Sequence, residues 1–134
     1  MRIYQVFVRS ASTKPICILD DDSSVLNSLR ELLASEGFEA ETFCDPDEFL
    51  TYTKSHPVKV AILDVWLPST SGIEVQEQLQ ELSPETEVIM ITGREERAIR
   101  TVALQNGALD FLSKPFDDEV LLRLIRDALC DVKP

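Results

Sequence analysis

Four short, mainly apolar runs, each ending at a polar or charged residue, most strongly constrain the fold of this 134-residue chain. The central run is Val60–Leu63, which stops at Asp64. The other three end in the same way: Ile16–Leu19 at Asp20, Val88–Ile91 at Thr92, and Phe111–Ser113 at Lys114. Such runs are typical of strands that are buried on both faces of a parallel sheet. Because ligands bind at the carboxyl edge of open parallel sheets, the pattern predicts one acidic site centred on Asp64.

Amphipathic segments separate these strands and predict helices. We expect helices at about 24–36, 45–56, 71–82, 94–105 and 117–130, and a further, less buried strand at 38–43. Gly37 and Gly107 stand at two of the expected helix ends. Regular alternation with short connections predicts an α/β fold, a flavodoxin-like (βα)5 doubly wound parallel sheet with strand order 2-1-3-4-5.

Composition argues against two classes of partner. A formal net charge of −11 is unfavourable for direct nucleic-acid binding, which needs a clustered basic face. No run approaches the roughly 18 apolar residues of a membrane span. Cys17, Cys44 and Cys130 show no metal-ligand spacing, so we expect reduced, packed thiols in a cytoplasmic protein. His56, beside Pro57, is expected to be a surface or capping residue.

Three carboxylates are expected to converge at the predicted site. Asp20, Asp21 and Asp64 meet if the first and third strands are neighbours. An oxygen-only, histidine-free ligand set suits Mg²⁺ best, with Mn²⁺ tolerated. The alternative is that the acids of residues 20–22 only cap the following helix. Capping needs a single acid, and Asp22, beside two serines, is the expected cap.

Lys114 and Thr92 follow two further strands and are candidates for the same site. A lysine at the mouth of an acidic metal site can contribute a point charge to a bound phosphoryl group. The alternative for Lys114 is an ordinary surface lysine paired with acids. Thr92 can offer a hydroxyl to the same phosphoryl oxygens, but residues 92–95 (Thr-Gly-Arg-Glu) also form a capping-box pattern that would start the next helix.

Taken together, five motifs resemble the receiver domain of two-component response regulators. They are, in chain order, Asp20-Asp21, then Asp64, then the pair Pro68 and Gly72, then Thr92-Gly93, and finally Lys114-Pro115-Phe116. The resemblance covers residues 15–130, and leaves 1–14 as an N-terminal extension of unknown role and 131–134 as a C-terminal tail. Short stretches of sequence, such as Ser-Gly-Ile-Glu at 71–74, are similar to those of the nitrogen-fixation, LuxR-related subgroup.

The resemblance implies specific roles for the site residues. Asp64 would be the phosphoacceptor, and Lys114 would hold a phosphoryl oxygen, with a cis bond to the following proline. Asp21, Asp64 and the backbone carbonyl of Trp66 would ligate Mg²⁺, and Asp20 would act mainly through water. The chemistry would be phosphoryl transfer by positioning and charge neutralisation.

The resemblance also implies a switch. Thr92 would swing to the phosphoryl group, and Phe111, which stands where the family more often has tyrosine, would turn inward. The output face would comprise the helix at 94–105, the last strand and the last helix. Leu104 and Leu122 fall off the expected core stripes and are candidates for a partner-facing patch on it.

Two departures from the family pattern flank the phosphoacceptor. Trp66 stands two residues past Asp64, and Arg94 stands two residues past Thr92. The indole would either slow or reshape dephosphorylation, or dock a helix of the kinase.

The resemblance implies the partners as well. The phosphoryl donor would be a sensor histidine kinase or a phosphotransfer protein, and phosphorylation could drive homodimerisation. Receivers of this subgroup commonly precede a DNA-binding helix-turn-helix, which suggests transcription regulation without nucleic-acid binding by these residues. The protein would be no enzyme beyond its own phosphorylation and dephosphorylation.

Two other functions compete with this reading. A pseudo-receiver would need a missing acid or lysine, and none is missing. A Mg²⁺-dependent aspartyl phosphatase of the haloacid-dehalogenase type would need a second aspartate at the position of Trp66.

Overall fold

A computed structural model of the protein describes residues 15–130, which form one five-stranded parallel sheet with a helix after each strand. The predicted extension 1–14 and tail 131–134 lie outside the described residues. The elements are β1 (Ile16–Leu19), α2 (Ser23–Ser35), β2 (Ala40–Phe43), α3 (Pro46–Ser55), β3 (Val60–Asp64), α4 (Gly72–Leu82), β4 (Glu87–Thr92), α5 (Arg97–Gln105), β5 (Asp110–Ser113) and α6 (Asp118–Leu129). The strand order is β2-β1-β3-β4-β5, which confirms the predicted flavodoxin-like topology.

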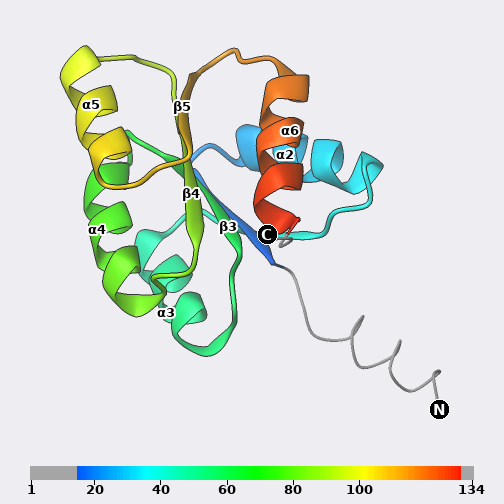
Figure 1. The fold of residues 1–134 in the computed structure, drawn as a ribbon, viewed down its shortest axis with the longest axis horizontal. Coiled ribbons are helices and arrows are strands. Elements are labelled where there is room, and N and C mark those ends of the chain that lie inside the picture. Colours follow the sequence, from blue (N-terminus) through cyan, green and yellow to red (C-terminus); the bar gives the residue numbers. More distant parts are fainter. Residues whose placement is uncertain (1–14, 131–134) are drawn as a thin grey trace.

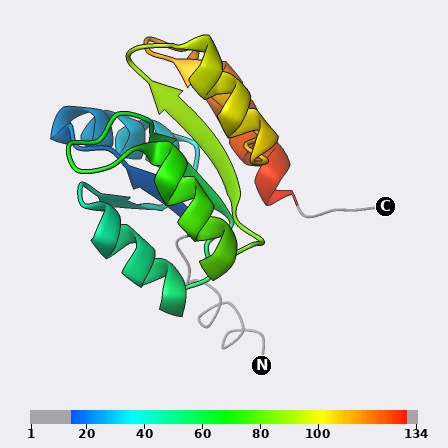
Figure 2. The same ribbon diagram turned by 90° about the vertical axis from the view of Figure 1, so that its left-hand side faces the viewer.

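The helices cover the sheet in two layers. α2 and α6 lie on one face, and α3, α4 and α5 lie on the other (Figure 1). Figure 2 looks onto the second layer, where these three helices stand in front of the strands. Alternate residues of each strand feed the two cores: Cys17, Ala61 and Met90 point to one, and Ile18, Ile62 and Ile89 to the other. Every residue of β1 and β3 is buried, as their apolar runs predicted.

Side-chain caps fix where most helices begin, and this positions the strand ends that precede them. Asp22, Asp45, Ser71 and Asp117 each accept a hydrogen bond from a backbone N–H in the first turn of the following helix. The prediction that Asp22 is the cap of α2 is therefore confirmed. Gly37, at φ +86°, ends α2 in the left-handed region that favours glycine.

The expected start of the helix at 94–105 was wrong. α5 begins at Arg97, and its cap residue Glu96 makes no side-chain capping bond. The reason lies in Thr92, whose side chain is bonded to the backbone of Arg94 and closes a turn at the end of β4. The capping-box alternative for Thr92 is thereby excluded, because no helix starts there.

Two further expectations fail, one about Leu122 and one about the packing of the cysteines. Leu122 is only 2% exposed and packs in the core between α6 and the sheet, because α6 buries a wider stripe than its strict periodicity indicated. Leu104, at 38%, is exposed as expected. Of the cysteines only Cys17 is packed, whereas Cys44 and Cys130 lie at element ends on the surface; all three thiols are free.

His56 is exposed and caps the C-terminal end of α3, as predicted. Within residues 15–130, no helix combines the length and the apolar character that crossing a membrane would require.

Candidate functional site

The three predicted acids converge at the carboxyl edge of the sheet. β1 and β3 are adjacent and parallel, with Leu19 opposite Leu63, so Asp20 and Asp64 emerge side by side. One carboxylate oxygen from each of Asp20, Asp21 and Asp64 lies within 4.8 Å of the other two. Asp20 and Asp64 are buried, and Asp21 is exposed. The acids therefore form an oxygen-only cluster that opens to solvent on one side.

Lys114 reaches this cluster from the end of β5. Its Nζ lies 3.0 Å from Asp20 Oδ2 and 3.8 Å from Asp64 Oδ1. The backbone N–H of Asp22 donates to the other Asp20 oxygen at 2.9 Å. The Lys114–Pro115 bond is cis, as the resemblance implied. Lys114 is thus paired with acids, but at the mouth of the site and not at an unrelated surface position.

The surroundings of Asp64 raise the pKa of its carboxyl group above that of an aspartate in water. Desolvation by burial is the main cause that raises the pKa of Asp64 from 3.8 to about 6, and the charge of Asp20 adds to it. The Lys114 ammonium and a backbone hydrogen bond from Trp66 act in the opposite direction. Asp64 is therefore mostly ionised at neutral pH. Its negative charge lies close to that of Asp20, and this arrangement favours the binding of a cation.

The donor set fits a divalent cation such as Mg²⁺. Small hard cations prefer carboxylate and carbonyl oxygens, and the acid cluster supplies oxygens without histidine or thiolate. A bound cation would reduce the electrostatic repulsion between the carboxylates of Asp20 and Asp64.

A cavity of about 390 Å³ lies over the acids. Its lining comprises Asp20, Asp21, Asp22, Asp64, Trp66, Gly93, Arg94 and Lys114. The sequence predicted most of these residues, but not that Trp66 and Arg94 touch. The Trp66 indole N–H donates to the Arg94 carbonyl at 3.0 Å, and the Arg94 guanidinium carbon lies 4.2 Å from the Trp66 ring centroid. A hydrogen bond to a backbone carbonyl leaves no mark in a sequence, so nothing could have revealed this contact.

Thr92 lies at the same edge, on β4 beside β3, and is fully buried. Its hydroxyl donates to the Arg94 carbonyl at 2.8 Å and accepts from the Arg94 N–H at 3.0 Å. Both hydrogen bonds of the Thr92 hydroxyl are therefore made to the backbone of Arg94.

Phe111 is 2% exposed. Arg100 donates to its backbone carbonyl at 3.0 Å and lies over its ring. The Phe111 ring is therefore buried in the core on the α3, α4 and α5 face of the sheet.

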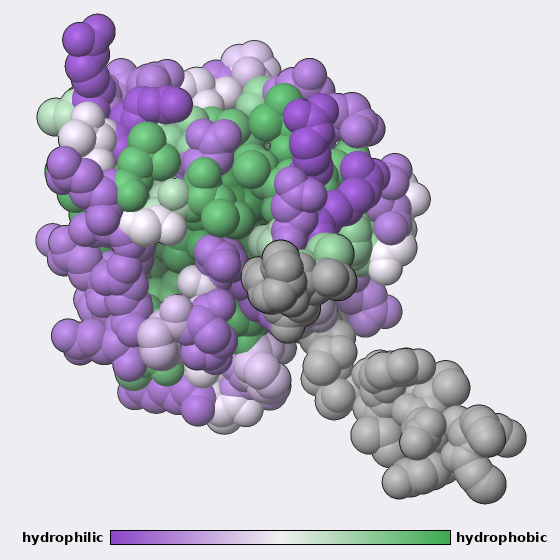
Figure 3. All heavy atoms as spheres, in the orientation of Figure 1, coloured by the Kyte–Doolittle hydropathy of each residue, from purple (hydrophilic) through white to green (hydrophobic). Residues whose placement is uncertain are grey.

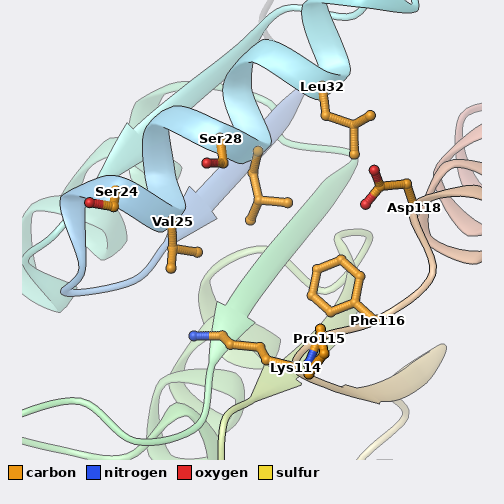
Figure 4. A pocket seen from close by; sticks show the side chains of 9 residues that line it. Ser24, Val25, Ser28, Leu32, Lys114, Pro115, Phe116 and Asp118 are labelled. Carbon is orange, nitrogen blue, oxygen red and sulfur yellow. The ribbon is translucent and has the colours of Figure 1, made fainter.

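An apolar groove adjoins the acidic cavity, with a volume of about 350 Å³. Figure 4 shows Val25 and Leu32 of α2 pointing toward Pro115 and Phe116 across it. Lys114 lines both the groove and the cavity. A protein bound in the groove would therefore lie directly beside Asp64.

Comparisons with known proteins agree with this geometry. A family model described as response regulator receiver domain matches residues 16–126. The response regulator protein TodT of Pseudomonas putida is 41% identical over 114 residues, which are 85% of this chain and 50% of TodT. The chain thus spans about half the length of the curated relatives it matches. Two receiver structures are similar over 87% of the chain. They are the beryllofluoride-activated NtrC4 receiver domain dimer (TM-score 0.81, 34% identity, 96% of that chain) and a CheY-like receiver from Methanospirillum hungatei (0.80, 32%, 93%).

Proposed function

The chain belongs to the response regulator receiver domain family, and from this premise we propose that it is a phosphoacceptor switch in which Asp64 accepts a phosphoryl group from a phosphohistidine. The observation that carries the proposal is the meeting of Asp20, Asp21 and Asp64 with Lys114 at one sheet edge. As a receiver domain, the chain is a signalling module and not a turnover enzyme.

The chemistry follows from what the side chains can do. An ionised Asp64 oxygen attacks the phosphorus of the donor, an O–P bond forms, and the N–P bond to the donor imidazole breaks. The imidazole nitrogen leaves with the bonding electron pair and takes up a proton. Lys114, which already lies near Asp64, neutralises charge on a phosphoryl oxygen.

Asp21, Asp64 and the Trp66 carbonyl would hold Mg²⁺, or Mn²⁺ in its place, and Asp20 would act through water. When bound, the cation neutralises carboxylate and phosphoryl charge. The protein then has only to keep donor and acceptor in line, which is the largest part of phosphoryl-transfer catalysis.

The direct test is intact mass after incubation with acetyl phosphate and Mg²⁺. We expect one phosphoryl group, about 80 Da, on the wild type, and none on Asp64→Ala or in the presence of a chelator. Asp47→Ala, at an exposed acid on α3, is the matched control and should be labelled like the wild type. If the wild type takes up no phosphoryl group and does not bind beryllofluoride either, the phosphoacceptor proposal is wrong and a pseudo-receiver is left.

Metal binding is separately testable, because Trp66 is the sole tryptophan and lines the site. We expect Mg²⁺ to change the Trp66 emission saturably and to raise the free energy of unfolding by roughly 2–3 kcal/mol at 100 times its Kd. Asp21→Asn should lower the affinity for Mg²⁺ by about tenfold or more, since loss of a side chain that only hydrogen-bonds to a metal ligand already has an effect of that size. The same affinity in Asp21→Asn and wild type would contradict the assigned ligand set.

The donor is expected to be a sensor histidine kinase or a phosphotransfer protein, docked in the groove between α2 and the segment after β5. The groove is apolar and shares Lys114 with the cavity, so a donor helix seated there places its histidine near Asp64.

The output is expected to use α5, β5 and α6. Figure 3 shows apolar surface between the polar flanks of this side of the molecule, where β5 forms the edge of the sheet. Val102 and Leu104 of α5 and Leu109 before β5 are exposed apolar residues of this region. Homodimerisation on phosphorylation, and regulation of transcription through another part of the protein, belong to the proposal. So does a cytoplasmic location, which the free thiols favour.

A further inference from the structure

A groove lies between α3 and α4, two of the helices that stand in front of the sheet in Figure 2. It consists of two cavities of about 250 and 350 Å³, which share Asp47, Leu50 and Gln78 as lining residues. One end lies at Lys54 and Leu82, in the last turns of the two helices. The two cavities therefore form one continuous feature, the α3–α4 groove.

The α3–α4 groove combines apolar and acidic side chains. Leu50 and Val75 line it and are buried. Asp47 and Glu81 line it with exposed carboxylates, and neither forms an ion pair with another residue of the described range 15–130. Among the described residues that line the two cavities, Lys54 is the only cation. Such a groove is suited to a segment that has both apolar and basic side chains.

The sequence of residues 1–14 has this chemistry. It contains Arg2, Arg9 and Lys14 and no acid, whereas all 24 acids of the chain lie in residues 15–134. Its apolar run is Val6-Phe7-Val8. The two parts of the chain are therefore opposite in charge, and the basic part carries apolar side chains that match the apolar side chains of the groove.

Pro15 joins this segment to the sheet at the edge where α3 and α4 end. The Pro15 carbonyl accepts from the N–H groups of Lys59 and Val60, at 2.8 and 3.0 Å, in the connection between α3 and β3. The Lys59 carbonyl in turn accepts from the Glu87 N–H at 2.8 Å, so the connection between α4 and β4 lies beside it. Residues 1–14 are thus attached close to the end of the groove that the last turns of both helices form.

The segment is long enough to occupy the groove from this point. α4 has 11 residues and is about 16 Å long. Fourteen extended residues reach roughly 45 Å, so several can form the connection while the apolar run still reaches Leu50. A short tether also gives the segment an effective concentration on the order of millimolar at the groove, so individually weak contacts are sufficient to keep the groove occupied.

We propose that residues 1–14 bind in the α3–α4 groove of their own chain, with the Arg9 guanidinium beside the carboxylates of Asp47 and Glu81 and the apolar run against Leu50. Phosphorylation of Asp64 is not required for this contact, because the groove and the acidic cavity have no lining residue in common. The contact is an interaction surface in addition to the phosphoacceptor site.

Trypsin cleavage after Arg9 measures the contact in the full chain, because a segment bound in the groove is less accessible to the protease. The double variant Asp47→Asn/Glu81→Gln removes both groove charges and introduces no new trypsin site. We expect it to be cleaved after Arg9 about fivefold faster than the wild type, since two exposed ion pairs are lost. The difference should disappear in about 1 M sodium chloride, which screens these charges.

Glu31→Gln/Glu39→Gln is the matched control. Glu31, on α2, and Glu39, before β2, are exposed acids that do not line the groove, and the substitutions remove the same total charge. The control variant should be cleaved after Arg9 at the wild-type rate. Equal cleavage rates in the groove variant and the control variant would overturn the proposal.

Photocrosslinking from position 7 tests where the segment binds. With p-benzoylphenylalanine in place of Phe7, irradiation of the dilute full chain should link position 7 to α3 or α4 of the same molecule, as mapped by mass spectrometry of the digest. Links to α2 or α6, or no link at all, would overturn the proposal. A covalent dimer as the main product would also overturn it and would assign the groove to the segment of a second copy. Labelling of Asp64 by acetyl phosphate is measured separately, so failure of either proposal leaves the other standing.

Discussion

Asp64→Asn is expected to stabilise the metal-free protein by about 3 kcal/mol at pH 7.5, although it removes the phosphoacceptor. The carboxyl of Asp64 has its pKa raised from 3.8 to about 6, mainly by burial and then by the charge of Asp20. Each tenfold change in proton affinity corresponds to about 1.4 kcal/mol. The folded protein therefore bears the free-energy cost of an ionised Asp64 at neutral pH, and an uncharged amide does not.

The pH dependence gives this prediction its sign. Between pH 3.8 and about 6 the folded state binds more protons at Asp64 than the unfolded state does, so wild-type stability falls as the pH rises through this window. The advantage of Asp64→Asn should consequently shrink to about 1 kcal/mol at pH 4.5 and vanish in stronger acid.

Urea unfolding in the presence of a chelator measures both effects. Glu77→Gln, at an exposed acid on α4, removes the same charge and is expected to change the free energy of unfolding by less than about 0.5 kcal/mol. An Asp64→Asn protein that is less stable than wild type at neutral pH, or equally favoured at both pH values, would contradict the role of burial.

Gly72→Ala is expected to destabilise the protein by about 3 kcal/mol, which lowers Tm by roughly 10 °C. A Cβ at Gly72 would lie 2.4 Å from the backbone carbonyl oxygen of Asp64 and 3.0 Å from Val65 Cα. Neither atom belongs to a flexible side chain, so the start of α4 must move away from the end of β3. The hydrogen bond from the Gly72 N–H to the Val65 carbonyl, 2.7 Å long, would be strained as well.

The displacement also reaches the site. The loop from Val65 to Ser71 carries Trp66, which forms an isolated bridge with Ser71. Phosphorylation of Gly72→Ala by acetyl phosphate should therefore slow about tenfold or more, since misplacement by even 1 Å can have a larger effect.

Gly93→Ala is the control for this substitution, because it also introduces one methyl group beside the site. A Cβ at Gly93 meets no atom within 4 Å, and its φ lies outside the left-handed region. We expect unchanged or slightly increased stability, as the unfolded chain loses freedom. Thermal unfolding of both variants decides the matter, and equal Tm values would show that the backbone contact at Gly72 is unimportant.

The parts of the fold that followed from the sequence are those that local chemistry governs. Val60–Asp64 could be assigned as a buried strand because only a parallel sheet covered on both faces accepts such a run. Asp22 could be assigned as a cap because its side chain bonds a backbone N–H group only two residues away. These interactions lie within a few residues of sequence and hardly depend on the rest of the chain.

One failure comes from a competing local turn, and the other from packing between segments that are far apart in the chain. Thr92 had the spacing of a helix cap, but its hydroxyl closes a turn with Arg94 and α5 starts later. Leu122 lay off the periodic apolar stripe of its helix, yet α6 packs closely enough against the sheet to bury it. In the case of Leu122 the outcome depends on how closely α6 approaches the sheet, which periodicity does not encode.

The sequence by itself determined the topology and the identity of the acids at the carboxyl edge, because strand burial and strand order bring Asp20, Asp21 and Asp64 together in any fold of this kind. Only the tertiary structure decided the distances between these groups, their environment and their contacts. It placed Lys114 at 3.0 Å from Asp20, raised the pKa of Asp64 by burial, and joined Trp66 to Thr92 through the carbonyl of Arg94. Desolvation and hydrogen bonds to backbone atoms depend on distances between segments that are far apart in the chain, and those distances exist only in the folded protein.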